Sequence, residues 1–402
     1  MDPSNSRRSF LRNVGFGSLA AIAVDSWTEA GDAAPDANVL GDSGVATSER
    51  PKKLWKPISD RKIRVGIAGY GVCQFGAAFG FQDHPNVTVA AVTDLIPDRC
   101  AALAKACRCE KTYPSLEEMV KDDKLEALFV ATDAPCHARH CIEAVKHGKH
   151  VATAVPAVFG SVEDAHVLYE TVEKSGRKYM MFETSAFRGD CHAMRQIFRA
   201  GGFGKSVYSE GEYYHYSEKP IPSFHEWRVG LPPQWYPTHA TAYYVCVTGG
   251  HFTEVSCLGM PDGRAALQSG GNRYQNPFGT EVALLRTSEG GMARMVVSFD
   301  TPGGECEVGR VRGQRGSMSG TTYTGDEKRL PDLECPPLPP GVAPGGHGGS
   351  HGHLMNEFVT AILEDRKPLV DLATALNLTV PGIVAHQSAV DGGETRKIPI
   401  FA

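Results

Sequence analysis

IRVGIAGYG, residues 63–71, decides the fold of this chain, because an apolar strand there runs directly into a glycine-rich turn. Residues 63–68 are short, apolar and rich in β-branched side chains, which is typical of a buried strand. An apolar helix is predicted to begin around Phe75. Glycines suit the turn between them, since the backbone must bend tightly and approach a pyrophosphate at the start of the helix. The residues of this turn predicted to contact a nucleotide are Gly69, Tyr70, Gly71, Val72 and Cys73.

A second strand, residues 87–93, ends at Asp94, which lies 25 residues after Gly69. A carboxylate at this position can accept hydrogen bonds from the adenosine ribose hydroxyls, and it repels a 2′-phosphate. The order of strand, turn, helix, strand and acid therefore predicts a dinucleotide site that favours NAD over NADP. The alternative is a glycine turn in some other α/β fold.

Segments of strand length and helix length continue to alternate as far as Glu183. We expect strands at 125–131, 151–154 and 178–182, helices at 96–106, 135–147 and 161–175, and a capping box at 115–118. This alternation predicts an α/β fold whose first part, residues 59–185, is a Rossmann doubly wound parallel sheet. The ligand of such a sheet lies at the carboxyl ends of its strands.

The pattern changes after about residue 205, where longer strands with alternating polarity follow one another. We expect strands at 206–216, 280–287, 291–299 and 306–312, then a proline-rich connector at 330–344 and helices at 353–364 and 372–387. Residues 186–402 are therefore predicted to form an α/β domain for substrate binding and oligomerisation. Its sheet is open and mainly antiparallel, with one face exposed, and the helices of residues 353–387 pack back on the protein.

The first 58 residues have a different character and are predicted to be a signal followed by a flexible spacer. Arg7 and Arg8 precede a weakly apolar stretch, residues 14–24, that is too short to span a bilayer. This arrangement resembles a twin-arginine export signal and predicts a periplasmic protein. The alternative is an incidental basic patch on a disordered tail.

The composition excludes some classes of partner. The net charge of −5 argues against nucleic acid or an acidic membrane surface, and no membrane span is expected in the mature protein. The 11 cysteines are scattered and mostly lie in apolar segments, which is typical of small buried side chains. We expect no metal and at most one disulfide.

Histidine and tyrosine are concentrated in the second domain. Tyr213 and His215 alternate at the end of a strand, so they share one face. His239 and Tyr243 lie one turn apart on a predicted helix that follows Tyr236. Imidazole and phenol groups can move hydroxyl protons, and flat rings pack against a sugar face, so this cluster predicts a carbohydrate site.

Each of these residues also has a plainer interpretation. Tyr213 could be ordinary strand packing, His215 could bond locally, and His239 could serve only the start of its helix. His347 lies in a glycine loop that also contains His351. No carboxylate or cysteine accompanies these histidines, so we expect the loop to line a pocket rather than to bind a metal.

With these motifs, the chain resembles the Gfo/Idh/MocA oxidoreductases over about residues 60–400. Thr132, His137 five residues later and the segment 148–151 match the family pattern. The resemblance implies a Rossmann domain beside an open-sheet α/β domain, hydride transfer between NAD(P) and a sugar or polyol carbon, and a homo-oligomer. It adds Thr132, His137 and Pro156 to the predicted cofactor contacts.

Two departures from the family pattern matter. Gln74 stands where the nucleotide turn usually has its third glycine, with Gly76 two residues on. Ala154-Val155-Pro156 replaces the family's Glu-Lys-Pro motif, so the lysine that normally acts as acid and base is missing.

A subgroup of the family accounts for the missing lysine. Residues 182–190, 213–215, 236–239 and 345–349 are similar to motifs of the NAD-dependent glycosidases typified by α-N-acetylgalactosaminidase. In those enzymes bound NAD oxidises the sugar C3 hydroxyl, the acidified C2 proton leaves, the glycosidic bond breaks by elimination, water adds and the hydride returns. The resemblance implies the catalytic residues Tyr213, His215, Tyr236 and His239 and the substrate residues Glu183, Arg188, Tyr243 and His347.

The sequence therefore predicts an exported enzyme with tightly bound NAD that oxidises a secondary hydroxyl of a sugar or glycoside, with His239 as the base. Net oxidation and redox-neutral cleavage both remain open at this point. A protein that senses a sugar or nucleotide without turnover is the alternative of a different class.

Overall fold

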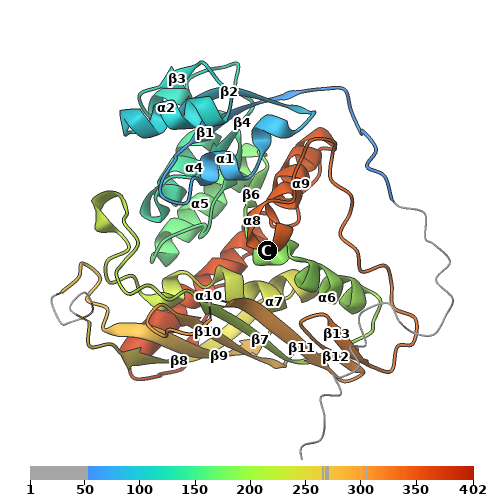
Figure 1. The fold of residues 1–402 in the computed structure, drawn as a ribbon. Helices are drawn as coiled ribbons and strands as arrows, with labels where there is room; N and C mark the ends of the chain where they lie inside the picture. Colours follow the sequence, from blue (N-terminus) through green and yellow to red (C-terminus); the bar gives the residue numbers. More distant parts are fainter. Residues whose placement is uncertain (1–52, 265–266, 268–270, 305) are drawn as a thin grey trace, which may run out of the picture.

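The computed structural model describes residues 53–264, 267, 271–304 and 306–402, which are arranged around two β-sheets (Figure 1). The predicted twin-arginine signal lies outside these ranges. Within them, no helix is both long enough and apolar enough to cross a membrane.

The first sheet has six parallel strands in the order β3-β2-β1-β4-β5-β6, which confirms the predicted doubly wound architecture. The strands are β1 (Ile63–Ala68), β2 (Val87–Thr93), β3 (Thr112–Tyr113), β4 (Ala127–Val130), β5 (His150–Thr153) and β6 (Tyr179–Met181). From β1 the chain first adds β2 and β3 on one side of that strand. It then crosses over and adds β4, β5 and β6 on the other side. A crevice opens at the carboxyl ends of the strands at such a reversal.

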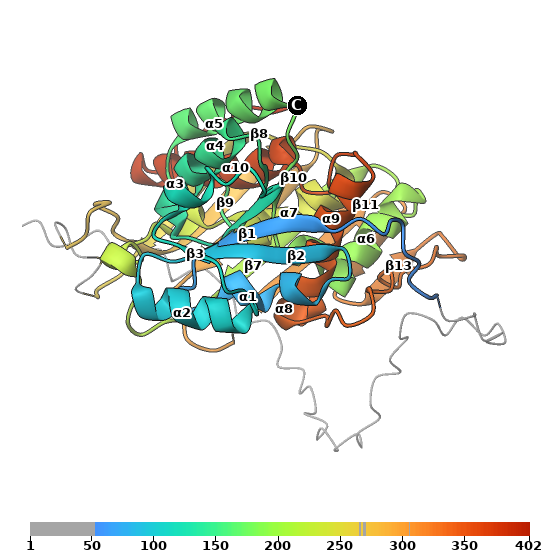
Figure 2. The ribbon, with the colours of Figure 1, turned by 90° about the horizontal axis from the view of Figure 1, so that it is seen from above.

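Helices cover both faces of this sheet. They are α1 (Phe75–Ala78), α2 (Pro97–Ala106), α3 (Leu116–Met119), α4 (His137–Lys146) and α5 (Val162–Ser175), with short 3-10 turns η1 (Phe81–Asp83) and η2 (Ala134–Cys136). Figure 2 shows α4 and α5 on one side and α1 and α2 on the other. Ser115 accepts a hydrogen bond from the Glu118 amide at the start of α3, as the capping box predicts.

The second sheet has eight strands in the order β13-β12-β11-β7-β10-β9-β8-β14. They are β7 (Ser206–Tyr214), β8 (Phe252–Pro261), β9 (Phe278–Thr287), β10 (Met292–Ser298), β11 (Cys306–Gly313), β12 (Gly316–Ser319), β13 (Thr322–Gly325) and β14 (Arg396–Lys397). Neighbouring strands are antiparallel except β7 and β10, which run parallel. The predicted open, mainly antiparallel sheet is confirmed.

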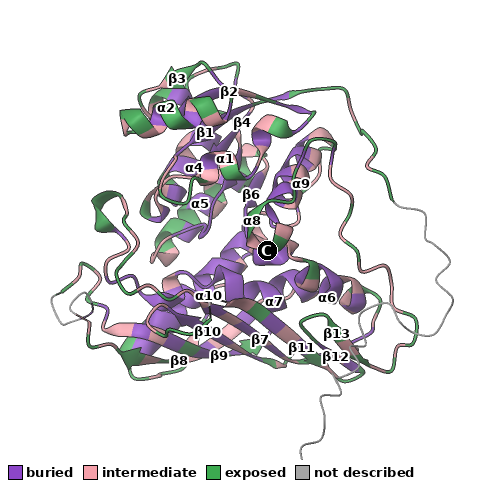
Figure 3. Ribbon diagram, in the orientation of Figure 1, coloured by how far each residue is buried: buried purple, intermediate pink, exposed green. Residues whose placement is uncertain are grey.

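In the described part of the chain, helices cover only the inner face of the second sheet. They are α6 (Gly189–Arg199), α7 (Thr238–Thr248) and α10 (Leu372–Val390), and the 3-10 turns η3 (Ser185–Phe187), η4 (Phe224–Glu226) and η5 (Pro233–Trp235) lie in the connections. Figure 3 shows α7 and α10 buried between the sheet and the first domain. The outer face carries exposed apolar side chains, among them Leu258, Met260 and Leu284.

Two paired glycines let α7 lie very close to the second sheet. Gly211 on β7 and Gly309 on β11 are register partners. A Cβ atom at Gly211 would lie 1.9 Å from the carbonyl oxygen of Ala240, and one at Gly309 would lie 2.0 Å from Cγ of Tyr243. This contact determines how close the first turn of α7 comes to the end of β7.

Helix α9 (His351–Leu363), which follows the single turn α8 (Gly346–Gly349), packs against the first sheet although it lies near the end of the chain. The ring of Phe358 lies 6.4 Å from that of Phe81 and 6.2 Å from that of Phe182. Leu354 and Met355 belong to the same buried cluster as the residues of β1. A late segment of the chain therefore completes the core of the nucleotide-binding domain.

Candidate active site

Three adjoining cavities lie along the carboxyl ends of the parallel strands. The first, about 320 Å³, is lined by the turn after β1 and by Asp94. A narrow second cavity shares Gly71 and Thr132 with it. The third, about 500 Å³, shares Cys73 and Tyr236 with the second and reaches into the second domain. The three together form one cleft between the domains.

The turn after β1 fits a pyrophosphate. Gly69 has φ of 103°, and a Cβ atom on it would lie 2.3 Å from the carbonyl oxygen of Ala131. Gly71 has no protein atom within 4 Å of its Cβ position and lines the first two cavities. Gly76 allows the close contact between helix and turn that the third glycine usually allows. A Cβ atom at Gly76 would lie 2.4 Å from the Gly69 carbonyl oxygen. The departure at Gln74 therefore leaves the turn intact.

Asp94 is held in place at the wall of the first cavity. Its two carboxylate oxygens accept hydrogen bonds from the amides of Tyr70, over 2.7 Å, and Ile96, over 2.9 Å. Each oxygen retains a further lone pair. The carboxylate is therefore oriented to accept hydrogen bonds from ribose hydroxyls, and this negatively charged acceptor fits NAD better than NADP, because it repels a 2′-phosphate.

His137 and Pro156, both predicted cofactor contacts, lie behind the cleft. The ring nitrogens of His137 lie 2.8 Å from the carbonyl oxygen of Pro156 and 2.9 Å from that of Thr132. Both ring nitrogens of His137 are therefore engaged by backbone carbonyl oxygens. Pro156 does not line any of the three cavities, whereas its neighbour Val155 lines two of them. His137 joins two loops that shape the cleft, while Thr132 faces the cavities directly.

The third cavity brings together most of the predicted catalytic and substrate residues. It is lined by Arg188, Tyr213, His215, Tyr236, His239 and His347. Tyr213 lies on β7 and His239 on α7, whereas Arg188, His215 and Tyr236 lie in the connections just before α6, just after β7 and just before α7. His347 lies in the glycine loop before α9. The rings of Tyr213 and His239 lie 4.6 Å apart, and those of His239 and His347 lie 6.5 Å apart. Residues separated by more than a hundred positions thus converge on one space.

His239 is paired with Glu183 at the back of this cavity. Nδ1 of His239 donates to Oε1 of Glu183 over 2.8 Å, and Glu183 is completely buried. Burial by itself lowers the pKa of His239, but the carboxylates of Glu183 and Glu307 raise it to about 9. Since Nδ1 is engaged, Nε2 is the nitrogen left for the cavity. Glu183, predicted to contact substrate, instead positions His239.

Replacement of Glu183 by glutamine is expected to lower the pKa of His239 by more than about one unit, because the nearest raising charge disappears. In the native protein the charged pair stabilises the fold below the ordinary imidazole pKa of 6.5, and this contribution is lost as the pH rises through about 9. Histidine NMR titration of the cofactor-free protein measures the change. Glu281→Gln is the matched control, since it removes the partner of another buried histidine, His386. An unmoved His239 titration in Glu183→Gln contradicts the assignment.

Glu307 is a site residue that the sequence did not reveal. It lies opposite Tyr213 in the register of β11 and β7 and lines the third cavity. Burial raises the pKa of Glu307, but the positive charges of His239, His347 and Arg188 lower it by more. The pKa of Glu307 therefore lies below its ordinary value. Only the strand register, which was unknown, could have pointed to this carboxylate.

The glycine loop carries His347 into the cavity. His347 has φ of 49°, and its Nδ1 lies 2.8 Å from Nε2 of His351. Gly348 has φ of 67°, and a Cβ atom there would lie 3.3 Å from the guanidinium of Arg188. The loop can therefore pass close to Arg188 only because it is rich in glycine.

Tyr243 does not reach the cavity, although it was predicted to contact substrate. It is fully buried, and its hydroxyl oxygen lies 3.1 Å from both a carboxylate oxygen of Asp190 and the Glu307 carbonyl oxygen, two acceptors for its single proton. One turn separates it from His239, but its ring lies over Gly309 on the sheet. Tyr243 holds β11 against α7.

The two tyrosines of the cavity, Tyr213 and Tyr236, stay protonated. Burial raises the pKa of Tyr213 well above its ordinary value and that of Tyr236 to about 12, so both act as hydrogen-bond donors. Val155, at the position of the family's lysine, is apolar and lines the cavity. His239, held by Glu183, is the candidate acid and base of this cavity.

All eleven cysteines are free thiols. In the described part of the chain, no group of three or more His, Cys, Asp or Glu side chains is placed to hold a metal ion.

Comparison with known proteins agrees with this geometry. Residues 63–183 match the Gfo/Idh/MocA family, described as an oxidoreductase family with an NAD-binding Rossmann fold. A glycosyl hydrolase family 109 protein of Solibacter usitatus is 24% identical over 89% of this chain and 93% of its own length. The apo scyllo-inositol dehydrogenase of Lactobacillus casei has the same fold, with a TM-score of 0.67 and 15% identity over 85% of this chain and 99% of that one. An aldose–aldose oxidoreductase of Caulobacter crescentus has a TM-score of 0.65 and 17% identity, covering 84% and 100% of the two chains.

Proposed function

From the premise that residues 63–183 form the NAD-binding domain of a Gfo/Idh/MocA oxidoreductase, we propose that this chain oxidises a secondary hydroxyl of a sugar or glycoside. The observation that carries the proposal is the His239–Glu183 pair at the wall of a cavity that opens onto the dinucleotide cleft. A base and a hydride acceptor must face the same carbinol carbon for this reaction, and proximity supplies much of the rate.

The residues have distinct tasks in this reaction. Gly71, Asp94 and Thr132 hold the dinucleotide, and NAD, when bound, supplies the hydride acceptor. Nε2 of His239 takes the proton of the sugar hydroxyl, while Tyr213 donates a hydrogen bond to the same oxygen. The positive charge of an oxidised nicotinamide ring in the cleft would lower the pKa of His239, because like charges repel. The imidazole could then lose its proton and act as a base.

We propose further that the cycle is redox-neutral and cleaves a glycosidic bond. Oxidation at C3 acidifies the C2 proton, a base removes it, and the electron pair expels the leaving oxygen from C1. Water then adds across the resulting double bond, and the hydride returns to C3. His215 and Tyr236 line the same cavity and serve the C2 proton and the leaving oxygen. The family 109 relatives and the replacement of the usual lysine by Val155 support this version.

Two measurements on purified protein test the proposal. Nucleotide released on denaturation is expected to be NAD by mass and ultraviolet absorbance. Aryl glycosides are expected to release their aglycone without added cofactor. Stoichiometric NADH from unmodified sugars would instead identify a dehydrogenase that depends on free NAD. Calorimetric sugar binding without any product would identify a sensing protein.

We also propose export to the periplasm by the twin-arginine signal and a homo-oligomer. Exposed Leu258, Met260, Leu284 and Met292 on the outer face of the second sheet support self-association, since large exposed apolar patches are typical of interfaces. Cell fractionation tests the export to the periplasm, and light scattering tests the homo-oligomer. A cytoplasmic location of the native protein, or a monomer at micromolar concentration, would contradict them.

A further inference from the structure

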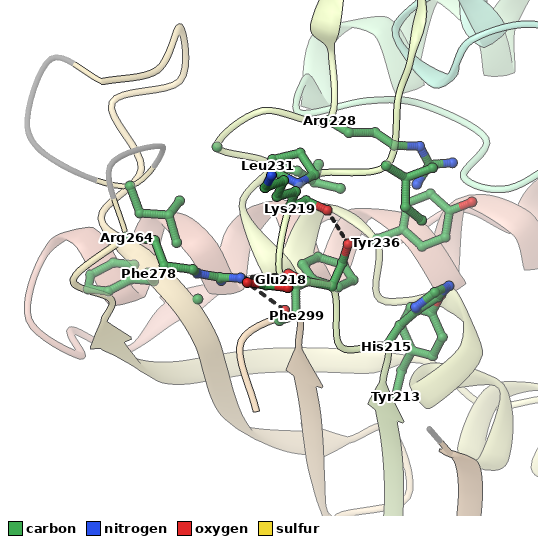
Figure 4. A pocket seen from close by; sticks show the side chains of 16 residues that line it. Tyr213, His215, Glu218, Lys219, Arg228, Leu231, Tyr236, Arg264, Phe278 and Phe299 are labelled. Atoms are coloured by element: carbon green, nitrogen blue, oxygen red, sulfur yellow. Dashed lines mark hydrogen bonds between the residues drawn. The ribbon is translucent and has the colours of Figure 1, made fainter. Parts of the chain in front are cut away.

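A fourth cavity adjoins the third on the side away from the dinucleotide cleft. It has a volume of about 270 Å³ and shares Tyr213, His215 and Tyr236 with the candidate active site. Figure 4 shows these three residues at one end and Leu231, Phe278 and Phe299 towards the other. We propose that this cavity is a leaving-group subsite for the apolar alkyl or aryl aglycone of a glycoside. The inference rests on the proposed function and names its substrate class.

The walls beyond the shared residues are largely apolar. Leu231 precedes η5, Phe278 begins β9, and Phe299 follows β10, so three separate parts of the second domain supply them. Leu267 completes this part of the wall, and Ile221 lies at the junction with the third cavity. A second sugar ring needs many hydrogen-bond partners for its hydroxyls, and an apolar wall supplies few of them.

Three basic side chains, Lys219, Arg228 and Arg264, line this cavity, and none is offered to an anion. The guanidinium of Arg228 lies over the ring of Trp227, 4.3 Å from its centroid. Arg264 is paired with the carboxylate of Asp262 and donates to the carbonyl oxygens of Ser217, over 2.8 Å, and Phe299, over 3.4 Å (Figure 4). The carboxylate of Asp262 therefore neutralises the charge of Arg264. The N–H donors of Arg264 bind the backbone at Ser217 and Phe299. Lys219 is exposed to solvent. A charged leaving group such as a phosphate would gain little here, whereas an uncharged apolar group would lose its water-exposed surface.

The size of the cavity fits a ring or a short chain. An apolar protein cavity of roughly 150 Å³ is large enough to bind benzene. With about 270 Å³, this one accommodates a substituted phenyl group or an alkyl chain of several carbons. The residues that the two cavities share, among them Arg228 and Ile221, meet them with side chains, so the cavities adjoin and a molecule that occupies one can contact the residues of the other.

A glycoside fits this pair of cavities better than a free sugar does. The sugar ring lies among the imidazole and phenol groups of the third cavity, and the substituent on its anomeric oxygen extends into the fourth. A free sugar or polyol leaves the apolar cavity without an occupant. The arrangement therefore favours substrates with an apolar group at C1.

The test is a series of n-alkyl glycosides, ethyl to hexyl, of the sugar whose aryl glycoside releases its aglycone. These alkoxide leaving groups have nearly the same basicity, so bond reactivity stays constant while apolar surface grows. We expect kcat/KM to rise by about three- to fourfold for each methylene that enters the cavity. A flat series, with turnover intact, overturns the subsite and leaves the proposed function standing. Absence of turnover with every glycoside overturns both.

A pair of variants separates the subsite from general damage. Ile221→Asn places an amide at the wall and is expected to reduce the rise per methylene to below about twofold. Val167→Asn, at a side chain 48% exposed on α5, is the matched control and should keep the native slope. A variant that merely weakens the catalyst lowers all members of the series in parallel. An unchanged slope in Ile221→Asn, with a well-folded protein, therefore also overturns the proposal.

Discussion

Replacement of His239 by glutamine is expected to lower kcat for aglycone release by about a thousand-fold, while NAD stays bound. Glutamine retains a polar side chain that can still meet Glu183, but it cannot accept the hydroxyl proton. The nucleotide contacts predicted for Gly71 and Asp94 lie elsewhere in the cleft. Loss of turnover without loss of cofactor therefore isolates the proton-transfer step.

The chain offers a matched control for this experiment. His386 on α10 is also buried, and its Nδ1 donates to Oε1 of Glu281 over 2.7 Å, as His239 does to Glu183. It packs against Trp235 and lines none of the four cavities. Single-turnover rates per folded molecule should be native-like in His386→Gln. Comparable losses in both variants, or aglycone release by His239→Gln at the native rate, would discard the assigned base.

Replacement of Gly211 by alanine is expected to destabilise the protein by at least about 3 kcal/mol, because the added methyl group meets backbone rather than a movable side chain. The carbonyl oxygen of Ala240, 1.9 Å from the new Cβ, can retreat only if α7 moves away from the sheet. His239 is the preceding residue of that helix. We therefore expect both the unfolding midpoint and the activity of the surviving folded protein to fall.

Thermal and denaturant unfolding of the NAD-loaded protein measure this effect. Gly189→Ala is the control, since Gly189 is exposed at the start of α6 and no atom lies within 4 Å of its Cβ position. Alanine there should leave stability unchanged or slightly improved, because it restricts the unfolded chain. A Gly211→Ala protein as stable as the control would show that α7 does not depend on the paired glycines.

The nucleotide-binding half was largely predictable because its signals are local. Gly69, Gly71 and Asp94 lie within one strand–turn–helix–strand unit, and their spacing alone indicates their task. Parallel strands buried on both faces are continuous apolar runs, so β4 and β6 were recognised from composition.

The second domain was less predictable because its contacts are between distant strands. Strand β8 was missed, since Gly259 and Pro261 interrupt its end, and the polar hairpin of β12 and β13 resembles a loop. The same limitation applies to the site. The motifs indicated His239 and Tyr213, but helical spacing also suggested Tyr243, whose ring the packing over Gly309 directs elsewhere. Glu307 depends on the register of β11 against β7, which no local pattern encodes.

The packing of α9 on the first sheet has a consequence for biosynthesis. Its residue Phe358 fills a place beside Phe81 and Phe182, yet it is translated long after both of them. The core behind the dinucleotide cleft is therefore complete only once α9 has been translated, and a nascent chain stalled before residue 351 lacks part of that core. A gene fragment that stops after the last parallel strand should accordingly yield an unstable product, whatever its apparent modularity.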